Sequence, residues 1–168
     1  CANGRVDLYR AWEFPFGWRH ERTLLTGISA SDMTIFRHDG HWWMLGTCAN
    51  NGGSTWDTLH AYFASDLLGD WQPHPGNPLL IDARSARQAG AIVRRANTLL
   101  RPVQNCTDGY GSGLGIAEIT KLNREEFSQI VIAQLKPAPR WNASGVHTLN
   151  STSRMEVMRA TMASVMPD

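Results

Sequence analysis

The sequence lacks long apolar runs, a signal-peptide pattern and any strong excess of charge. Its apolar runs are a handful of residues, far short of the ~20 that cross a bilayer, so we expect a soluble segment with no membrane span. It opens at Cys1 with no basic stretch, apolar run and cleavage site, so we expect any signal peptide to be removed and the native start to lie elsewhere. Lys plus Arg number 16 and Asp plus Glu 15, with the basic residues scattered, which excludes the usual charge pattern of a nucleic-acid-binding protein.

Cysteine is scarce as well. Cys1, Cys48 and Cys106 have none of the spacings of a metal site, and three cysteines cannot all pair within one chain. We therefore expect no disulfide framework, no bound metal and no cofactor.

Three N-x-S/T sequons are present, at Asn105, Asn142 and Asn150. They are glycosylation acceptors only if the chain enters a eukaryotic secretory route. The sequence does not assign the compartment: we expect the Golgi or secretory lumen for a eukaryotic source and the cytoplasm for a bacterial one.

A repeat runs along the chain. The pattern Y-x-A-x6-W begins at Tyr9 and again at Tyr62, and each copy continues to a Leu-Leu pair. Periods of roughly 20–50 residues are typical of solenoids and propellers. Because large aromatic side chains bury the most apolar area, we expect Trp18 and Trp71, which end the two copies, to wedge between adjacent blades.

Hairpins recur at a similar spacing. The first has Asp39-Gly40 as its turn, and this dipeptide between β-rich runs is the strongest short-range hairpin signal. The second turns near Ala96-Asn97. Helix is scarce, and only 122–127 (L-N-R-E-E-F) is predicted to form a helical turn. Further strands are expected after each hairpin, at 60–64, 71–80, 115–120 and 127–135.

These features predict an all-β fold, a partial β-propeller of four-stranded antiparallel blades. About three blades are present in the single domain 1–168, too few to close a ring. The predicted segments are the outer half of one blade (6–25), two full blades (27–80 and 86–137) and a partial last blade (145–160).

Longer motifs resemble a known family. The segments 31–45 (SDMTIFRHDGHWWML), 66–78 (DLLGDWQPHPGNP), 86–90, 101–106 and 141–150 look like the N-terminal five-bladed propeller module of glucosamine inositolphosphorylceramide transferases. That module is similar in fold to family 43 glycosidase and arabinanase propellers. The resemblance covers nearly the whole chain and implies that about two upstream blades, which would pack against this region, are missing from it.

The chain departs from the family pattern at several positions. It has Asp32-Met33 where the family usually has Asp-Pro, and Arg87-Gln88-Ala89-Gly90 where the family has Arg-Pro-Gly/Ala-Gly. Asn105 and Asn150 replace aspartates of the Gln-Asp-Cys and His-Leu-Asp motifs. Because an amide cannot exchange a proton as a carboxylate does, we exclude both asparagines from acid or base roles.

In a propeller the innermost strands line a central funnel, so residues on or just before them are expected to converge there. Their side chains offer a carboxylate, guanidinium groups, an amide, an imidazole and a phenol, which suit sugar hydroxyls or a phosphate oxygen. The candidate catalytic residue is Asp32, and the candidate ligand-binding residues are Arg87, Arg101, Gln104, Tyr110 and His147.

Glycoside hydrolysis needs two carboxyl groups ~5–9.5 Å apart, and Asp32 is the one strong candidate here. Asp57 and Asp108 on loops and Glu118 on a strand are weaker ones. Asp32 also has a structural alternative, which is to accept backbone N–H bonds in a turn. Arg87 lies among small residues, and a buried guanidinium needs a partner, either Asp32 or an anionic ligand. 

Three functions remain open on sequence alone. The favoured one is a carbohydrate-binding propeller whose funnel takes a glycan or sugar phosphate, as the accessory domain of a glycosyltransferase. The second is a glycosidase-like hydrolase that uses Asp32, with its acid on a missing blade. The third is a non-catalytic interaction platform that uses the rim. His147 is either a core histidine, a water-mediated ion ligand as in some related propellers, or a donor to the substrate.

Overall fold

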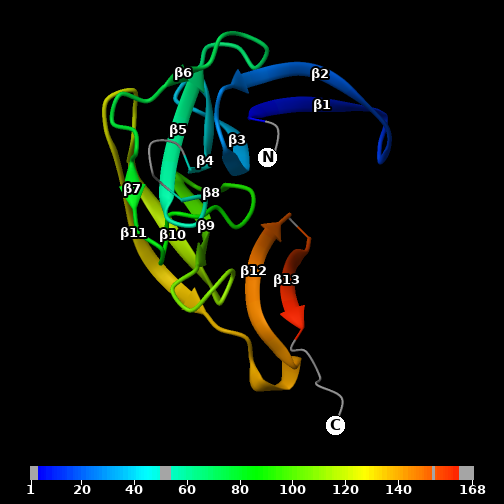
Figure 1. The fold of residues 1–168 in the computed structure, drawn as a ribbon, viewed down its shortest axis with the longest axis vertical. Coiled ribbons are helices and arrows are strands. Elements are labelled where there is room, and N and C mark those ends of the chain that lie inside the picture. The colour runs from blue at the N-terminus through cyan, green and yellow to red at the C-terminus, as the bar shows by residue number, and fades with distance from the viewer. Residues whose placement is uncertain (1–3, 50–53, 153, 163–168) are drawn as a thin grey trace.

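The computed structural model describes residues 4–49, 54–152 and 154–162, and in these ranges the regular structure is β-strand apart from one 3-10 turn (Figure 1), which confirms the all-β prediction. The elements are β1 (Arg5–Glu13), β2 (Phe16–Thr26), β3 (Ala30–His38), β4 (His41–Cys48), β5 (Thr58–Ala64), β6 (Gln72–Pro73), β7 (Leu80–Ile81), β8 (Val93–Arg95), β9 (Thr98–Asn105), β10 (Gly113–Leu122), β11 (Phe127–Leu135), the 3-10 turn η2 (Pro139–Trp141), β12 (Ala143–Ser151) and β13 (Glu156–Met162).

The described strands form antiparallel sheets that follow one another along the chain. The hairpin β1–β2 comes first, then a sheet in the order β3-β4-β5-β6 with β7 also paired to β5, then a sheet in the order β11-β10-β9-β8, and last the hairpin β12–β13. Figure 1 shows them one after another along an arc, with the two hairpins at its ends. Sequential strands are therefore neighbours within each sheet, as expected for repeated antiparallel units.

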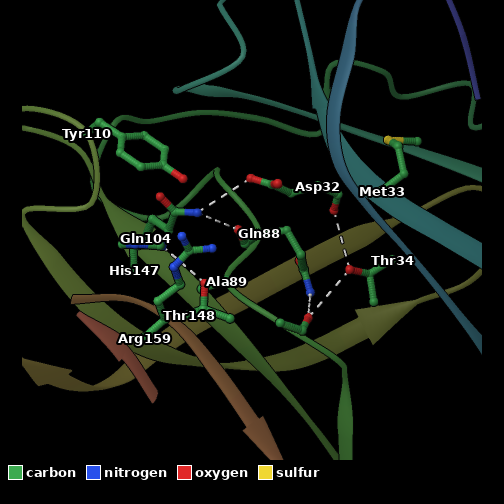
Figure 2. A pocket seen from close by; sticks show the side chains of 11 residues that line it. Asp32, Met33, Thr34, Gln88, Ala89, Gln104, Tyr110, His147, Thr148 and Arg159 are labelled. Atoms are coloured by element: carbon green, nitrogen blue, oxygen red, sulfur yellow. Dashed lines mark hydrogen bonds between the residues drawn. The ribbon is translucent and has the colours of Figure 1, made fainter. Parts of the chain in front are cut away.

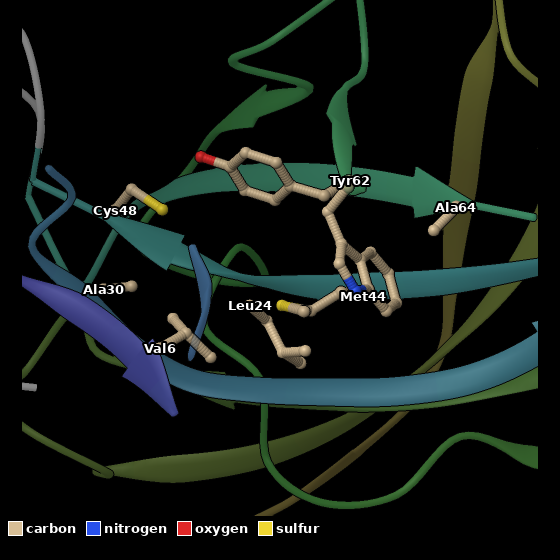
Figure 3. Close-up of a cluster of buried hydrophobic side chains, with 8 residues drawn as sticks. Val6, Leu24, Ala30, Met44, Cys48, Tyr62 and Ala64 are labelled. Atoms are coloured by element: carbon tan, nitrogen blue, oxygen red, sulfur yellow. The ribbon is translucent and has the colours of Figure 1, made fainter. Parts of the chain in front are cut away.

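Buried apolar clusters join each sheet to the next. Figure 3 shows the first, in which Val6 and Leu24 from the β1–β2 hairpin meet Met44 and Tyr62 of the following sheet. Burying a side chain of this size contributes about 1.5–3 kcal/mol, so each cluster can hold two sheets face to face. The later clusters contain Trp43, Leu99, Ile119 and Leu122, then Leu45, Leu59, Ala61 and Ala86, and finally Ala89, Leu114 and Val146.

Both predicted hairpin turns are confirmed. Asp39 and Gly40 have φ of 47° and 75°, and Ala96 has φ of 51°. Positive φ at the central positions matches the twist of the flanking strands, which is why Asp-Gly carries the signal. β3 and β4 pair up to His38 and His41 at the turn.

The fourth strand predicted at 71–80 is shorter than expected. It splits into β6 and β7, and both pair with β5. Proline cannot donate to a ladder, and Pro73, Pro75 and Pro78 interrupt the run. The side-chain amide of Asn77 fills the gap, because it accepts from the backbone N–H of Ala61 and donates to its carbonyl at 2.9 and 2.8 Å.

Two other expectations are wrong. Residues 122–127 form no helical turn; instead the Asn123 side chain accepts hydrogen bonds from the backbone N–H groups of Glu125 and Glu126, each at 2.8 Å, and bends the chain between β10 and β11.

The two tryptophans expected to wedge between blades differ. Trp71 is buried in the first cluster, but Trp18 is 56% exposed near the end of the β1–β2 hairpin. That end extends away from the next sheet, so Trp18 has no blade to wedge against in the described chain.

Cys48 and Cys106 are free and buried, and Cys1 lies outside the described residues. Within the described ranges, no group of His, Cys, Asp and Glu side chains could hold a metal ion. No helix in the same ranges has the length and apolarity to cross a membrane.

Candidate functional site

A polar pocket of about 310 Å³ opens where the β3 strand, the segment before β8 and the β12–β13 hairpin meet. Figure 2 shows the side chains of Asp32, Gln104, Tyr110, His147 and Arg159 gathered around it from these separate elements. The lining residues are Asp32, Met33, Thr34, Gln88, Ala89, Gly90, Gln104, Tyr110, His147, Thr148 and Arg159.

Asp32 reaches the pocket because β3 is bulged. It lies within β3 rather than before it. The β3–β4 pairing shifts between Ser31 and Thr34, and Asp32 has φ of 55°. A bulge places an extra residue on one strand and re-aims its side chains, so consecutive residues can face one site. The partner strand has Gly46 at this point, where a Cβ would collide with the Met33 side chain.

Arg87 lies behind the pocket and is paired with Asp32. Its Nη2 is 2.8 Å from Asp32 Oδ2, and its Nη1 donates to the Thr55 carbonyl at 2.7 Å. The guanidinium also lies under the Tyr110 ring, 4.9 Å from the ring centroid. The Arg87 side chain is only 9% exposed, so the predicted need for a partner is met by Asp32. Its Nε is buried without a hydrogen-bond acceptor among the described residues.

His147 reaches the pocket through a second bulge. The β12–β13 register shifts between Val146 and Thr148, so His147 is the extra residue and both it and Thr148 line the pocket. The His147 ring lies 5.3 Å from the Tyr110 ring, and its Nδ1 is 3.1 Å from the Thr148 hydroxyl. Burial lowers the pKa of His147, and the positive charges of Arg159 and Arg87 lower it further, while Asp32 acts in the opposite direction.

The β12–β13 hairpin approaches this closely only because three glycines admit it. A Cβ on Gly90 would collide with the Leu149 carbonyl, and one on Gly111 would lie 2.5 Å from the His147 Cβ. A Cβ on Gly145 would lie 2.5 Å from the Gly111 carbonyl oxygen. Each of these added Cβ atoms would lie far inside van der Waals distance. The absence of a side chain at the three glycines therefore lets the hairpin, and with it His147, pack against the pocket.

Arg101 and Gln104 have different positions on β9. Gln104 lines the pocket and donates to the Gln88 carbonyl at 3.0 Å. Arg101, in contrast, is 0% exposed and does not reach the pocket. It donates to the Gln88 side chain at 2.8 Å and to the carbonyls of Ser85 and Ala86, so it fixes the segment that forms the pocket floor.

The buried charge of Arg101 has only neutral hydrogen-bond partners. Its fourth acceptor is the side chain of Gln129, at 2.9 Å. Burial lowers its pKa to about 9, which leaves it charged at neutral pH. A buried cation without a carboxylate beside it contributes a positive potential to the floor above it.

The pocket has one carboxylate, Asp32. The weaker candidates do not reach it. The Asp57 side chain accepts from the Thr58 hydroxyl at 2.7 Å, Asp108 lines a different hollow, and Glu118 lies within β10. The described residues therefore supply a hydrogen-bonding site rather than a pair of carboxyl groups.

The comparison with known families identifies the chain. Residues 1–164 match the family described as "Glucosamine inositolphosphorylceramide transferase 1, N-terminal". The chain belongs to this family. The family resemblance found in the sequence is thus confirmed.

Two curated relatives show how similar the chain is to known proteins and how much of each it covers. Glucosamine inositolphosphorylceramide transferase 1 of Arabidopsis thaliana is 31% identical over 152 residues, which cover 86% of this chain and 20% of the relative. The protein of the same name from Oryza sativa subsp. japonica is 28% identical over 154 residues, which cover 87% and 21%. The chain thus spans about a fifth of the length of these relatives. No solved structure matches it.

The two asparagines that replace aspartates of the family pattern both bind backbone. The Asn105 side chain accepts from the Thr107 N–H at 3.0 Å, and the Asn150 side chain accepts from the Ala91 N–H at 3.0 Å. The Asn150 contact joins the β12–β13 hairpin to the segment that lines the pocket. Both asparagine side chains therefore accept backbone N–H groups in this chain.

Sequence reasoning missed Thr148 and Arg159 as pocket residues. They are direct cross-strand partners in the β12–β13 hairpin. A cross-strand pair can be located by counting outward from a turn, but the bulge at His147 changes the count by one. The sequence does not reveal the bulge, so it gives no signal that the side chains of Thr148 and Arg159 face the pocket.

Proposed function

We propose that this chain forms about three blades of a five-bladed propeller whose funnel binds a sugar or sugar phosphate, as the accessory domain of a glycosyltransferase-type protein. In this proposal 27–80 and 86–137 are full blades, 6–25 is the outer half of one blade, 145–160 is a partial last blade, and the polar pocket is part of the funnel. The face-to-face packing of successive antiparallel sheets supports the propeller. The relatives' printed name, a glucosamine inositolphosphorylceramide transferase, supports the sugar-related role.

The observation that carries the proposal is the composition of the pocket. Asp32 supplies acceptors, Gln104 and Thr148 supply donors and acceptors, and His147 supplies a ring nitrogen. The Tyr110 ring is 47% exposed and forms one wall. An amphipathic aromatic ring beside several hydrogen-bonding groups suits a sugar, which has an apolar face and a rim of hydroxyls.

The described residues do not by themselves supply the groups for hydrolysis, so the hydrolase alternative still needs an acid from a blade outside this chain. A glycosidase uses two carboxyl groups, and one of them needs a raised pKa to act as acid. The pocket has Asp32 alone, and Arg87 holds that carboxylate in an ion pair.

Calorimetric titration of the full-length protein with glucose, glucosamine and glucose 1-phosphate tests the proposal. We expect Tyr110→Ala to weaken sugar binding about tenfold, because stacking and pocket shape are lost, with a loss of only about 1 kcal/mol in unfolding free energy from its contact with Arg87. Tyr9→Ala is the matched control, since Tyr9 is 50% exposed but lies on the β1–β2 hairpin away from the pocket. Equal affinities in both variants and the unmodified protein, or no sugar binding at all, would overturn the proposal.

A further inference from the structure

The charges around the pocket do not balance. Asp32 is the one carboxylate in its lining, and the ion pair with Arg87 neutralises it. Arg101 lies beneath the floor with neutral partners, and Arg159 contributes a further positive charge to the lining. Among the residues that the structure describes around the pocket, one negative charge therefore faces three guanidinium groups.

Arg159 is the cation best placed to act on a ligand. It lies on β13 at the pocket wall, and Figure 2 shows its side chain directed toward Gln104 and His147. Within the described residues it forms neither an ion pair nor a side-chain hydrogen bond, whereas Arg87 and Arg95 are paired with Asp32 and Glu156. The fork of donors on Arg159 is thus available to a bound molecule.

The bulge at His147 gathers further donors beside this guanidinium. Thr148 is the direct cross-strand partner of Arg159, and its hydroxyl lies 3.1 Å from His147 Nδ1. A hydroxyl, an imidazole and a guanidinium therefore face one volume from two adjacent strands. Oxyanions are commonly bound by such convergent donors, with arginine as the bidentate partner.

We propose that this pocket selects a sugar that carries an oxyanion, bound between Arg159 and the His147–Thr148 pair. The inference rests on the proposed sugar-binding function and narrows its ligand class. The shared chemistry is the oxyanion, and its source is either a phosphate ester or a sugar carboxylate. In this arrangement Asp32 and Gln104, which also line the pocket, contact the sugar hydroxyls.

The experiment compares three ligands of similar size by calorimetry on the full-length protein at low ionic strength: glucose, glucose 1-phosphate and glucuronate. We expect at least tenfold tighter binding of one or both charged sugars than of glucose, and the stronger of the two identifies the source. Arg159→Gln should abolish this preference, because it weakens the binding of the charged sugars far more than the binding of glucose, while Arg159→Lys should keep part of the preference because the charge remains.

Arg154→Gln is the matched control, because Arg154 is an exposed arginine at the turn of the same hairpin and does not line the pocket. It should behave as the unmodified protein. A preference for charged sugars that persists in Arg159→Gln, or equal affinity for all three sugars, would overturn the oxyanion site. Sulfate binding that depends on Arg159, without binding of any sugar, would support the oxyanion site and overturn the proposed sugar function.

Discussion

The two hairpins at the ends of the arc are built alike but are held differently. β1–β2 packs its base on the next sheet through Val6 and Leu24, while its far end leaves Trp12 78% exposed. β12–β13 buries Val146 and His147 against the preceding sheet. The first hairpin is held by side chains at one end, and the second by close approach of the backbone.

This difference shows how the pocket is assembled. Side-chain packing of the β1–β2 kind tolerates small shifts, because apolar contacts are not directional. The β12–β13 hairpin is also fixed by backbone hydrogen bonds, since the Leu149 N–H donates to the Ala89 carbonyl at 2.7 Å and the Asn150 side chain accepts from Ala91. A ligand site needs such fixed geometry, and the pocket is found at this hairpin.

The largest expected effect comes from Gly90→Ala. The new Cβ would meet the Leu149 carbonyl, and φ at Gly90 is 148°, which side chains rarely adopt. We expect a loss of about 3 kcal/mol in unfolding free energy, from overpacking and backbone strain together, and loss of ligand binding. Denaturant titration and calorimetry measure the two effects.

Gly40→Ala is the control for this comparison. Gly40 also has positive φ, 75°, but no atom lies within 4 Å of its Cβ position. It should cost about 1 kcal/mol from strain alone and leave binding intact. If the two variants lose equal stability and both still bind, close backbone approach is not what holds the second hairpin.

A smaller effect is expected from pH. The pKa of His147 is below its ordinary value, so the ring is neutral at pH 7.5, and protonation at lower pH adds a positive charge to the pocket. A bound anion favours the protonated ring, so sulfate should bind on the order of three- to tenfold more tightly at pH 5.5 than at pH 7.5. Sulfate is suitable because its charge is constant over this range. The increase should disappear in His147→Gln, and an increase of the same size in that variant would exclude His147 as its source.

The smallest effect is expected at the exposed end of the first hairpin. Trp12→Ser removes a mostly exposed ring that contacts the Arg19 guanidinium at 5.4 Å, so we expect a change of about 0.5 kcal/mol or less in unfolding free energy. Trp43→Ala, in the buried cluster, should cost about 3–5 kcal/mol. Comparable losses in chemical denaturation would show that Trp12 is packed in solution and would remove the contrast between the hairpins.

The sequence was informative wherever a local rule decides the structure. The Asp39-Gly40 turn needs positive φ at both residues, and the strand expected at 127–135 from the spacing of the hairpins is β11. The helical turn at 122–127 was wrong because Asn123 can accept backbone N–H groups in a bend, a competitor that residue preferences do not reveal.

The candidate site was less predictable, because bulges and burial depend on distant partners. Asp32, Arg87, Gln104, Tyr110 and His147 come together around the pocket, whereas Arg101 is three residues from Gln104 on β9 and lies behind the floor. The sequence does not distinguish an arginine that binds a ligand from one that donates to backbone carbonyls. The difference is visible only in the folded structure, where carbonyl groups surround Arg101.

The side-chain amide of Gln88 lies between the buried Arg101 guanidinium and the pocket. Its two hydrogen bonds fix which end carries the oxygen and which the nitrogen. Its oxygen accepts from Arg101 and its nitrogen donates to the Gly90 carbonyl at 2.6 Å. Glutamate at this position would cancel the charge of Arg101 and also repel the Gly90 carbonyl. The neutral side chain of Gln88 therefore keeps the pocket floor electropositive and holds the neighbouring backbone in place.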